Sequence, residues 1–136
     1  RKENPFEFTG LDSLSGKRVG VIRGYGYSDA FNAATHFIRD AVPSMDHNIN
    51  LLLRKRIDLT LEDEIAAKAL IHKMGPKVED QLDFSANAFA SNPLHVAAGL
   101  KHPRHKEIVD AFNRGLVAIK ADGSFLAIES RYGLVK

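Results

Sequence analysis

The sequence contains no cysteine among its 136 residues, which excludes disulfides and cysteine-held metal sites. A cytosolic enzyme and a bacterial periplasmic protein can both lack cysteine, so this absence does not choose a compartment. Long apolar runs are also absent, and the longest is far shorter than the roughly 20 residues that span a bilayer. Arg1–Phe8 is charged and interrupted by Pro5, which is unlike a signal peptide. Because the sequence starts without methionine, we expect it to begin inside a longer polypeptide.

A block of one charge sign is missing as well. The 19 lysines and arginines are interspersed with 17 aspartates and glutamates, and the formal net charge is +2. No basic patch or stripe therefore indicates a nucleic-acid partner. Apolar residues make up 44% and charged residues 26% of the chain, which is typical of a soluble globular domain. The sequence also has no internal repeat, low-complexity tract or heptad array.

Strand and helix patterns alternate along the chain as far as Leu100. The near-continuous apolar run in Lys17–Ile22 predicts a strand that is buried on both faces. Ser28 is a good N-cap, so we expect a helix to begin there and to end before Pro43. The expected apolar face of this helix consists of Phe31, Ala34, Ile38 and Ala41.

The following segments continue this alternation. We expect a short helix over residues 48–56, a strand over 56–63, a helix over 63–74, a weak strand within 76–89 and a clearer strand within 93–100. In the strand over 56–63, Ile57, Leu59 and Leu61 alternate with polar neighbours. Gly75 and Pro76 end the helix that follows. The pattern predicts an α/β fold, an open sheet with helices on both of its faces.

Two further helices are expected after His102, over residues 105–123 and 124–133. Both carry apolar residues at helical spacing, and they lead into no further strand. The stripe needs a surface to cover, and this chain does not supply an evident one. Its residues are Ile108, Val109, Phe112, Leu116, Ile119, Phe125 and Ile128.

The stretch GVIRGYGYSDAF, residues 20–31, joins the first expected strand to the first expected helix through two glycines. Gly24 and Gly26 match the start of a G-x-G-x-x-G motif, but Asp29 occupies the third glycine position. A carboxylate there would repel a pyrophosphate, and no P-loop lysine is present, so the pattern disfavours a nucleotide site. A plain glycine-rich turn is one remaining interpretation.

A site for a small anion such as a carboxylate is the other interpretation of this turn. The N–H groups of Gly26, Tyr27 and Ser28 would converge on the anion at the N-terminus of the helix. Arg23 would add positive charge, and Tyr25 or Tyr27 would provide an aromatic wall.

Four acidic residues lie in and after the second expected strand: Asp58, Glu62, Asp63 and Glu64. Asp63 lies where this strand ends and its helix begins. In an open α/β sheet, ligands bind beyond the carboxyl ends of the strands, where the Gly24–Tyr27 turn and Asp63 both fall. The acid would bind a positively charged group and the turn a negatively charged group. A small zwitterion such as an amino acid carries both groups close together. The alternative is that Asp63 and Glu64 cap a helix, which needs no ligand.

The histidines and hydroxyl residues form no recognisable catalytic or metal-binding motif. His95, His102 and His105 cluster loosely, but no nearby carboxylate completes a metal set, so we expect surface histidines. No serine or threonine pairs with a histidine and an aspartate in a nucleophile motif. We therefore expect no catalytic residues, metal or cofactor.

Three stretches carry a resemblance to a known family: LDSLSGKRVGVIRGYGYSD (residues 11–29), LLLRKRIDLTLEDE (51–64) and HPRHKEIVDAFNRGLVAIKADGSFLAIESRYG (102–133). In this order they resemble the second half of a bacterial extracellular solute-binding protein of family 3. These proteins are the periplasmic polar-amino-acid receptors of ABC transporters. The closing tail is the most specific stretch, and the resemblance covers nearly the whole chain without the family's first lobe.

The resemblance implies a periplasmic-binding-protein-like type II fold, in which two α/β lobes joined by two crossing segments close around a ligand. Residues 1–9 would be a hinge or linker, 10–94 the second lobe, 95–100 the return crossing, and 101–136 helices that pack on the first lobe. It also implies a periplasmic protein that is not an enzyme and that delivers its solute to an ABC transporter permease. The missing first lobe, or a second copy of the chain, would cover the apolar stripe.

In amino-acid-binding members, the turn after the first strand of this lobe donates N–H groups to the ligand carboxylate. The acid that ends the next strand receives the ligand ammonium. In this chain the turn corresponds to residues 24–27 and the acid to Asp63, and Arg23 would add positive charge beside the turn. The expected ligand-binding residues are therefore Arg23, Gly24, Tyr25, Gly26, Tyr27 and Asp63. Family members often have threonines in this turn, whereas this chain has Gly-Tyr-Gly-Tyr, so an aromatic or otherwise unusual amino acid, or another small polar solute, also fits.

Two other functions remain open for a chain with this resemblance. One is a ligand-sensing domain of a membrane histidine kinase or cyclase. The other is an enzyme built on the same fold, a dehydratase or a lytic transglycosylase accessory domain. The enzyme would need an acid or base aimed into the cleft, for which Glu62 or Glu64 is the candidate.

Overall fold

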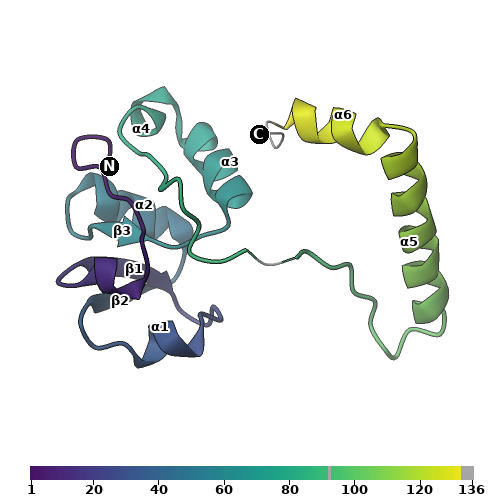
Figure 1. The fold of residues 1–136 in the computed structure, drawn as a ribbon, viewed down its shortest axis with the longest axis horizontal. Helices are drawn as coiled ribbons and strands as arrows, with labels where there is room; N and C mark the ends of the chain where they lie inside the picture. Colours follow the sequence, from purple (N-terminus) through teal and green to yellow (C-terminus); the bar gives the residue numbers. More distant parts are fainter. Residues whose placement is uncertain (92, 133–136) are drawn as a thin grey trace. The chain divides into compact units, whose positions relative to one another are not determined.

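The structure is a computed structural model that describes residues 1–91 and 93–132. The chain divides into two compact units, Arg1–Ser91 and Asn92–Lys136 (Figure 1). The first unit contains a parallel sheet with its covering helices, and the second contains two helices. The elements of the first unit are a 3-10 helix (Leu11–Leu14), β1 (Arg18–Ile22), α1 (Asp29–Ala33), β2 (Ile38–Val42), α2 (Met45–Leu53), β3 (Leu59–Thr60), α3 (Glu64–Met74) and α4 (Pro76–Glu79).

The sheet has three parallel strands in the order β2-β1-β3. Strand β1 lies in the centre, and its register with β2 runs from Arg18 opposite Ile38 to Ile22 opposite Val42. Strand β3 pairs with β1 over two positions, so it is much shorter than the expected strand over residues 56–63. The predicted α/β class is confirmed as a mixed α/β unit with a small parallel sheet.

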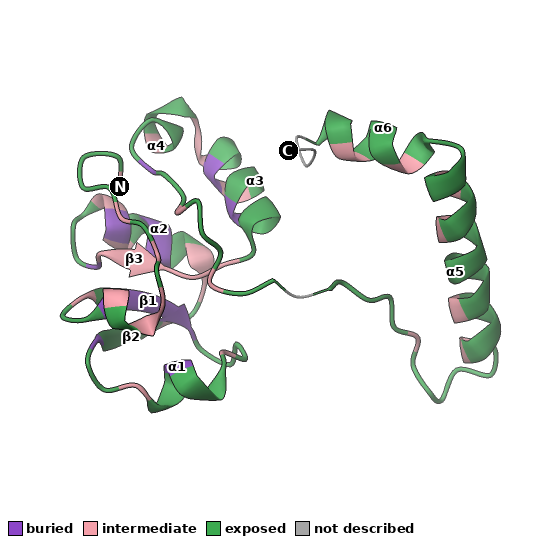
Figure 2. Cartoon of the chain, viewed as in Figure 1, coloured by how far each residue is buried: buried purple, intermediate pink, exposed green. Residues whose placement is uncertain are grey.

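Alternate residues of β1 point to opposite faces of the sheet, and helices cover both faces (Figures 1 and 2). Val19 and Val21 face α1 and pack with Phe31. Gly20 faces the other way, where a Cβ atom would meet Asn48 of α2. Each face therefore has its own apolar cluster. The buried members are Leu14, Val19, Val21, Phe31 and Phe37 on the α1 side, and Ile49, Leu52, Ile57, Ile71 and Leu82 on the side of α2 and α3.

The predicted helix from Ser28 to Pro43 is wrong beyond its first turns. Ser28 is the N-cap, and its side chain accepts a hydrogen bond from the Phe31 N–H at 3.3 Å, but α1 ends at Ala33. Ile38 and Ala41 lie in β2 instead. Apolar residues spaced three to four positions apart over so short a stretch are compatible with a helix and with a strand. The β-branched residues and the backbone pairing with β1 favour the strand.

The other expected helices are confirmed, but the two last expected strands are wrong. Gly75, with φ of 99°, ends α3, and Pro76 then occupies the first position of α4, where its missing N–H costs nothing. A helical turn thus begins the stretch in which a weak strand was expected. Pro93 and residues 94–100 have no strand in the part of the chain that the structure describes. The apolar run alone is not sufficient, because a strand also needs a hydrogen-bonding neighbour.

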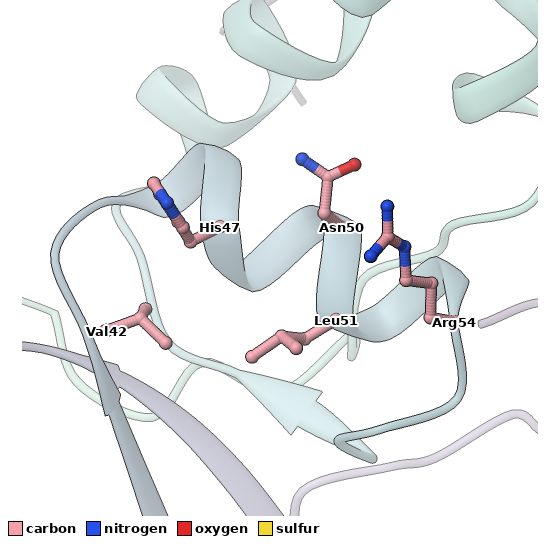
Figure 3. A pocket seen from close by; sticks show the side chains of 5 residues that line it. All are labelled: Val42, His47, Asn50, Leu51 and Arg54. Atoms are coloured by element: carbon pink, nitrogen blue, oxygen red, sulfur yellow. The ribbon is translucent and has the colours of Figure 1, made fainter.

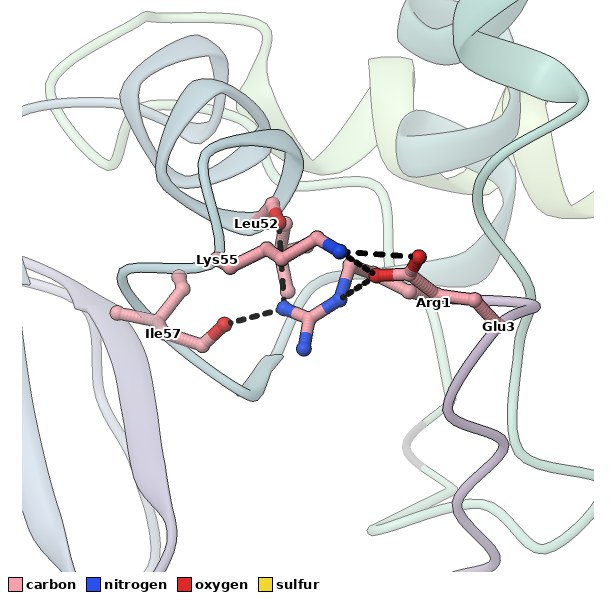
Figure 4. Close-up of polar contacts among 5 residues, drawn as sticks. All are labelled: Arg1, Glu3, Leu52, Lys55 and Ile57. Carbon is pink, nitrogen blue, oxygen red and sulfur yellow. Dashed lines mark hydrogen bonds and ion pairs between the residues drawn. The ribbon is translucent and has the colours of Figure 1, made fainter.

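The first residue of the chain is anchored against the first unit (Figure 4). The Arg1 guanidinium donates hydrogen bonds to the carbonyl oxygens of Leu52 at 3.2 Å and Ile57 at 2.9 Å. Glu3 forms ion pairs with both Arg1 and Lys55. Arg1 therefore satisfies a carbonyl in the last turn of α2 and fixes the connection that leads into β3.

Glu7 ties the incoming segment to residues 85–87. Its carboxylate accepts hydrogen bonds from the Asn87 N–H at 2.7 Å, the Ala86 N–H at 3.0 Å and the Ser85 hydroxyl at 2.9 Å. The same hydroxyl oxygen accepts the Phe8 N–H. Residues 1–9, which were expected to be a hinge or linker, are therefore part of the first unit, where they are hydrogen-bonded to residues 85–87.

These hydrogen bonds, led by the one from Asn87, hold the pKa of Glu7 below its ordinary value of 4.5. A lowered folded-state pKa means that the ionised carboxylate stabilises the fold above pH 4.5, and that this contribution is lost as pH falls through the folded-state pKa. We expect the amide resonances of Ala86 and Asn87 to titrate with a midpoint below 4.5 in NMR spectra. Glu7→Gln should abolish this titration, whereas a wild-type midpoint at or above 4.5 would contradict the three-bond arrangement.

The second unit contains α5 (His105–Ala121) and α6 (Ser124–Arg131), which contact each other. Gly123 between them has φ of 83°, a left-handed conformation that favours glycine. Neither helix contains a buried residue (Figure 2). In the expected apolar stripe, Ile108, Phe112 and Ile128 are exposed, and the remaining members are half-buried.

Candidate functional site

The segment that follows β1 is a tight turn. The Tyr25 N–H donates to the Ile22 carbonyl at 3.2 Å, and Gly24 has φ of 81°, which an L side chain rarely adopts. Among the residues that the structure describes, the N–H groups of Gly26, Tyr27 and Ser28 have no hydrogen-bond acceptor. The turn therefore presents three consecutive donors. Because α1 has five residues, its dipole adds less positive potential than the long helix of the sequence prediction.

Tyr27 fixes this turn against the sheet. Its hydroxyl oxygen accepts a hydrogen bond from the Ile22 N–H at 2.9 Å, and its ring lies 5.2 Å from the Phe31 ring, centroid to centroid. Burial raises the pKa of the Tyr27 hydroxyl, the bond from Ile22 opposes this, and the charge of Glu62 adds to it. Glu62 follows β3, the parallel neighbour of β1, so the turn after β1 and the segment after β3 lie at the same edge of the sheet.

The segment after β3 carries the acidic residues. Asp63 is the N-cap of α3, and its Oδ1 accepts a hydrogen bond from the Ala66 N–H at 3.0 Å. The Asp63 N–H in turn donates to Glu62 Oε1 at 2.9 Å. The capping interpretation of Asp63 is therefore confirmed. The other carboxylate oxygen of Asp63 has no hydrogen-bond partner within the described residues, so capping leaves it available.

The structure brings most of the predicted site residues to one edge. Strands β1 and β3 are parallel neighbours, so the Gly24–Tyr27 turn and Asp63 both lie beyond their carboxyl ends. Tyr25 is 53% exposed, and its ring centroid is 6.5 Å from that of Tyr27. Arg23 is exposed at the start of the turn, and in the described part of the chain its side chain makes no polar contact.

Two of the four acids of the sequence cluster have other positions. Asp58 Oδ2 accepts the Arg18 N–H at 2.8 Å, at the opposite end of β1. Glu64 pairs with Lys68 one helical turn later on α3. Glu62, in contrast, is half-buried and its charge acts on Tyr27, whereas the sequence analysis named it only as the candidate acid or base of an enzyme. Its position directly before Asp63, at the end of the strand, was the available signal.

A hollow in the first unit lies elsewhere (Figure 3). It measures about 320 Å³ and lies between the end of β2 and α2, with an apolar floor and a polar rim. Its lining residues are Val42, His47, Asn50, Leu51 and Arg54. The turn and Asp63 form open surface, as one side of a cleft between two lobes would.

The described residues contain no group of three or more metal-ligating side chains. None of the helices described is long and apolar enough to cross a membrane. Comparison with protein-family models, curated proteins and solved structures finds no match to this chain.

Proposed function

We propose that this chain is a ligand-binding lobe that captures a small polar solute, an amino acid, by its two charged ends. One observation carries the proposal: unpaired N–H donors and carboxylate acceptors occupy neighbouring segments at the carboxyl edge of the sheet. In open α/β sheets this edge is where ligands bind. A zwitterion presents an anion and a cation a few bond lengths apart, and such an edge can satisfy both.

The N–H groups of Gly26, Tyr27 and Ser28 would bind the ligand carboxylate, and Arg23 would add positive charge. The second oxygen of Asp63 would accept the ligand ammonium. Tyr27 holds the turn in place through its bond to Ile22, and Tyr25 offers an exposed ring to the rest of the ligand.

The resemblance to solute-binding proteins of family 3 supports the rest of the proposal. In this proposal the fold is the type II periplasmic-binding arrangement and the protein is periplasmic. It delivers its solute to an ABC transporter permease and catalyses no reaction. Residues 10–94 are the second lobe, residues 95–100 the return crossing, and α5 and α6 cover the first lobe. The absence of buried residues in these two helices supports that last assignment.

An NMR titration of the 136-residue chain tests the binding site. Because half of the ligand contacts would be missing, we expect binding in the millimolar range for amino acids. The largest amide shifts should occur at Gly26, Tyr27, Ser28 and Asp63, and Glu79 should not shift. Acetate and methylamine, each carrying one of the two charges, serve as controls and should shift one segment each. Shifts centred on another surface would contradict the proposal, as would micromolar binding by the chain alone.

A further inference from the structure

We propose that this chain forms a two-fold symmetric dimer through strand β2, with a second copy of the chain as the partner. The proposal does not depend on the ligand or on the proposed function. Strand β2 lies at the edge of the sheet, and among the described residues it has a neighbouring strand on one side only. Such an edge can pair with another strand through its backbone.

The backbone of β2 has a regular set of unpaired groups. The Ile38 N–H donates to the Lys17 carbonyl at 2.9 Å, and the Val42 carbonyl accepts the Arg23 N–H at 2.9 Å. Even-numbered residues therefore direct their backbone groups toward β1, and Arg39 and Ala41 direct theirs away from it. The N–H and C=O groups of Arg39 and Ala41 have no hydrogen-bond partner within the described residues.

An antiparallel pairing of two copies satisfies all of these groups. With the two-fold axis at Asp40, Arg39 of each copy lies opposite Ala41 of the other. Residues opposite each other in this type of pair exchange two hydrogen bonds. Two such pairs form four hydrogen bonds, which use every outward-facing N–H and C=O group of both Arg39 and both Ala41 residues. The edge is therefore self-complementary.

The same register brings an exposed side chain to an apolar hollow. Ile38 is 51% exposed, and it lies on the same face of β2 as Val42, four residues later. Val42 and Leu51 form the apolar floor of the hollow beside α2 (Figure 3). In the antiparallel pair, Ile38 of one copy lies opposite Val42 of the other and covers this floor. Because both features belong to each copy, the contact forms twice.

Asp40 opposes this pairing, because like charges directly opposite each other are destabilising. Each Asp40 already accepts a hydrogen bond from the Arg18 guanidinium of its own chain at 2.8 Å. The axis therefore holds two ion pairs instead of two bare carboxylates. Each ion pair is neutral overall, which reduces this cost.

Sedimentation velocity of the full chain over a range of concentrations tests the proposal. We expect a dimer that dissociates on dilution. Ala41→Pro removes an N–H that faces away from β1, so it leaves the bonds to β1 in place and should weaken the dimer by about tenfold or more. Ile38→Lys should weaken it similarly, because it places two lysine side chains against the apolar floor of the hollow. Ile65→Lys replaces an isoleucine of α3 that is 46% exposed, and it should change nothing.

Circular dichroism checks that each variant is folded. If Ala41→Pro does not fold, the effect of Ile38→Lys on dimerisation decides the test. A chain that stays monomeric at every concentration would overturn the proposal. So would a dimer that neither Ala41→Pro nor Ile38→Lys weakens, because association would then use another surface, such as the apolar stripe of α5 and α6.

Discussion

Replacing Gly20 with alanine is expected to destabilise the first unit by about 3 kcal/mol, the upper end of the usual cost of overpacking a core. A Cβ atom at this position would overlap the Asn48 side-chain oxygen and would lie 2.6 Å from Ile57 Cδ1. Both neighbours are side-chain ends, but Asn48 is 0% and Ile57 2% exposed, so neither has room to move. Because β1 is the central strand, its displacement would also shift the Gly24–Tyr27 turn.

Urea unfolding followed by tyrosine fluorescence measures this effect, since the chain has three tyrosines and no tryptophan. Gly26→Ala is the matched control: a Cβ atom there meets nothing within 4 Å. Adding Asn48→Ala to Gly20→Ala should recover part of the lost stability, because it removes the closest clash. If Gly20→Ala is as stable as Gly26→Ala, α2 does not pack as closely on β1 as the structure has it.

Asn48 shows what the sequence does not reveal about this core. It is fully buried, and within the described residues neither its side-chain oxygen nor its side-chain nitrogen has a hydrogen-bond partner. Helical periodicity places it on the inner face of α2, but an asparagine is normally assigned to the surface. Gly20 is equally uninformative in the sequence, because a glycine inside an apolar run does not indicate which residue packs against it.

The secondary structure could be predicted where the sequence pattern is compatible with only one kind of element. The apolar run of β1, the capped helix α3 and the amphipathic helix α5 are such cases, and the structure confirms them. Residues 38–42 were ambiguous, because their apolar spacing fits a short helix and a strand alike. The pairing with β1 decided the outcome, and pairing is a tertiary interaction that the local sequence does not contain.

The placement of the two segments of the candidate site at one edge of the sheet was predictable, because both follow expected strands at their carboxyl ends. Two segments that follow parallel neighbouring strands must lie at the same edge, and this placed the Gly24–Tyr27 turn beside Asp63. The position of Tyr27 was not predictable in the same way. Its ring packs on Phe31 and its hydroxyl accepts the Ile22 N–H, whereas the sequence analysis offered Tyr25 or Tyr27 as an aromatic wall of the site.

Asp63 caps α3 and is also the proposed ligand acceptor, and the substitution Asp63→Ser separates these two roles. Its Oδ1 caps α3, and its second oxygen is the proposed acceptor for the ligand ammonium. Serine is as good an N-cap as aspartate, so Asp63→Ser should keep the stability of the first unit within a few tenths of a kcal/mol. Asp63→Ala loses the cap as well, which costs about 1 kcal/mol.

Both substitutions remove the carboxylate, so both should weaken amino-acid binding strongly. Removing one partner of a desolvated charge pair costs roughly 2–5 kcal/mol, which is about 30-fold or more in affinity. Glu79→Ala is the control, because Glu79 is exposed and contacts only His72 at 3.5 Å among the described residues. In the isolated chain the ligand-induced shifts should disappear in both Asp63 variants, and calorimetry on a longer chain that carries the proposed first lobe would measure the difference in affinity.

The comparison of the two Asp63 variants decides between a ligand contact and a cap. If Asp63→Ser binds amino acids as weakly as Asp63→Ala while unfolding like the wild type, the carboxylate acts on the ligand directly. If Asp63→Ser binds like Glu79→Ala and only Asp63→Ala loses affinity, Asp63 acts through α3 and the ammonium binds elsewhere. Glu62 is then the acid to replace next, because it lies beside Asp63 and acts on Tyr27 of the same edge.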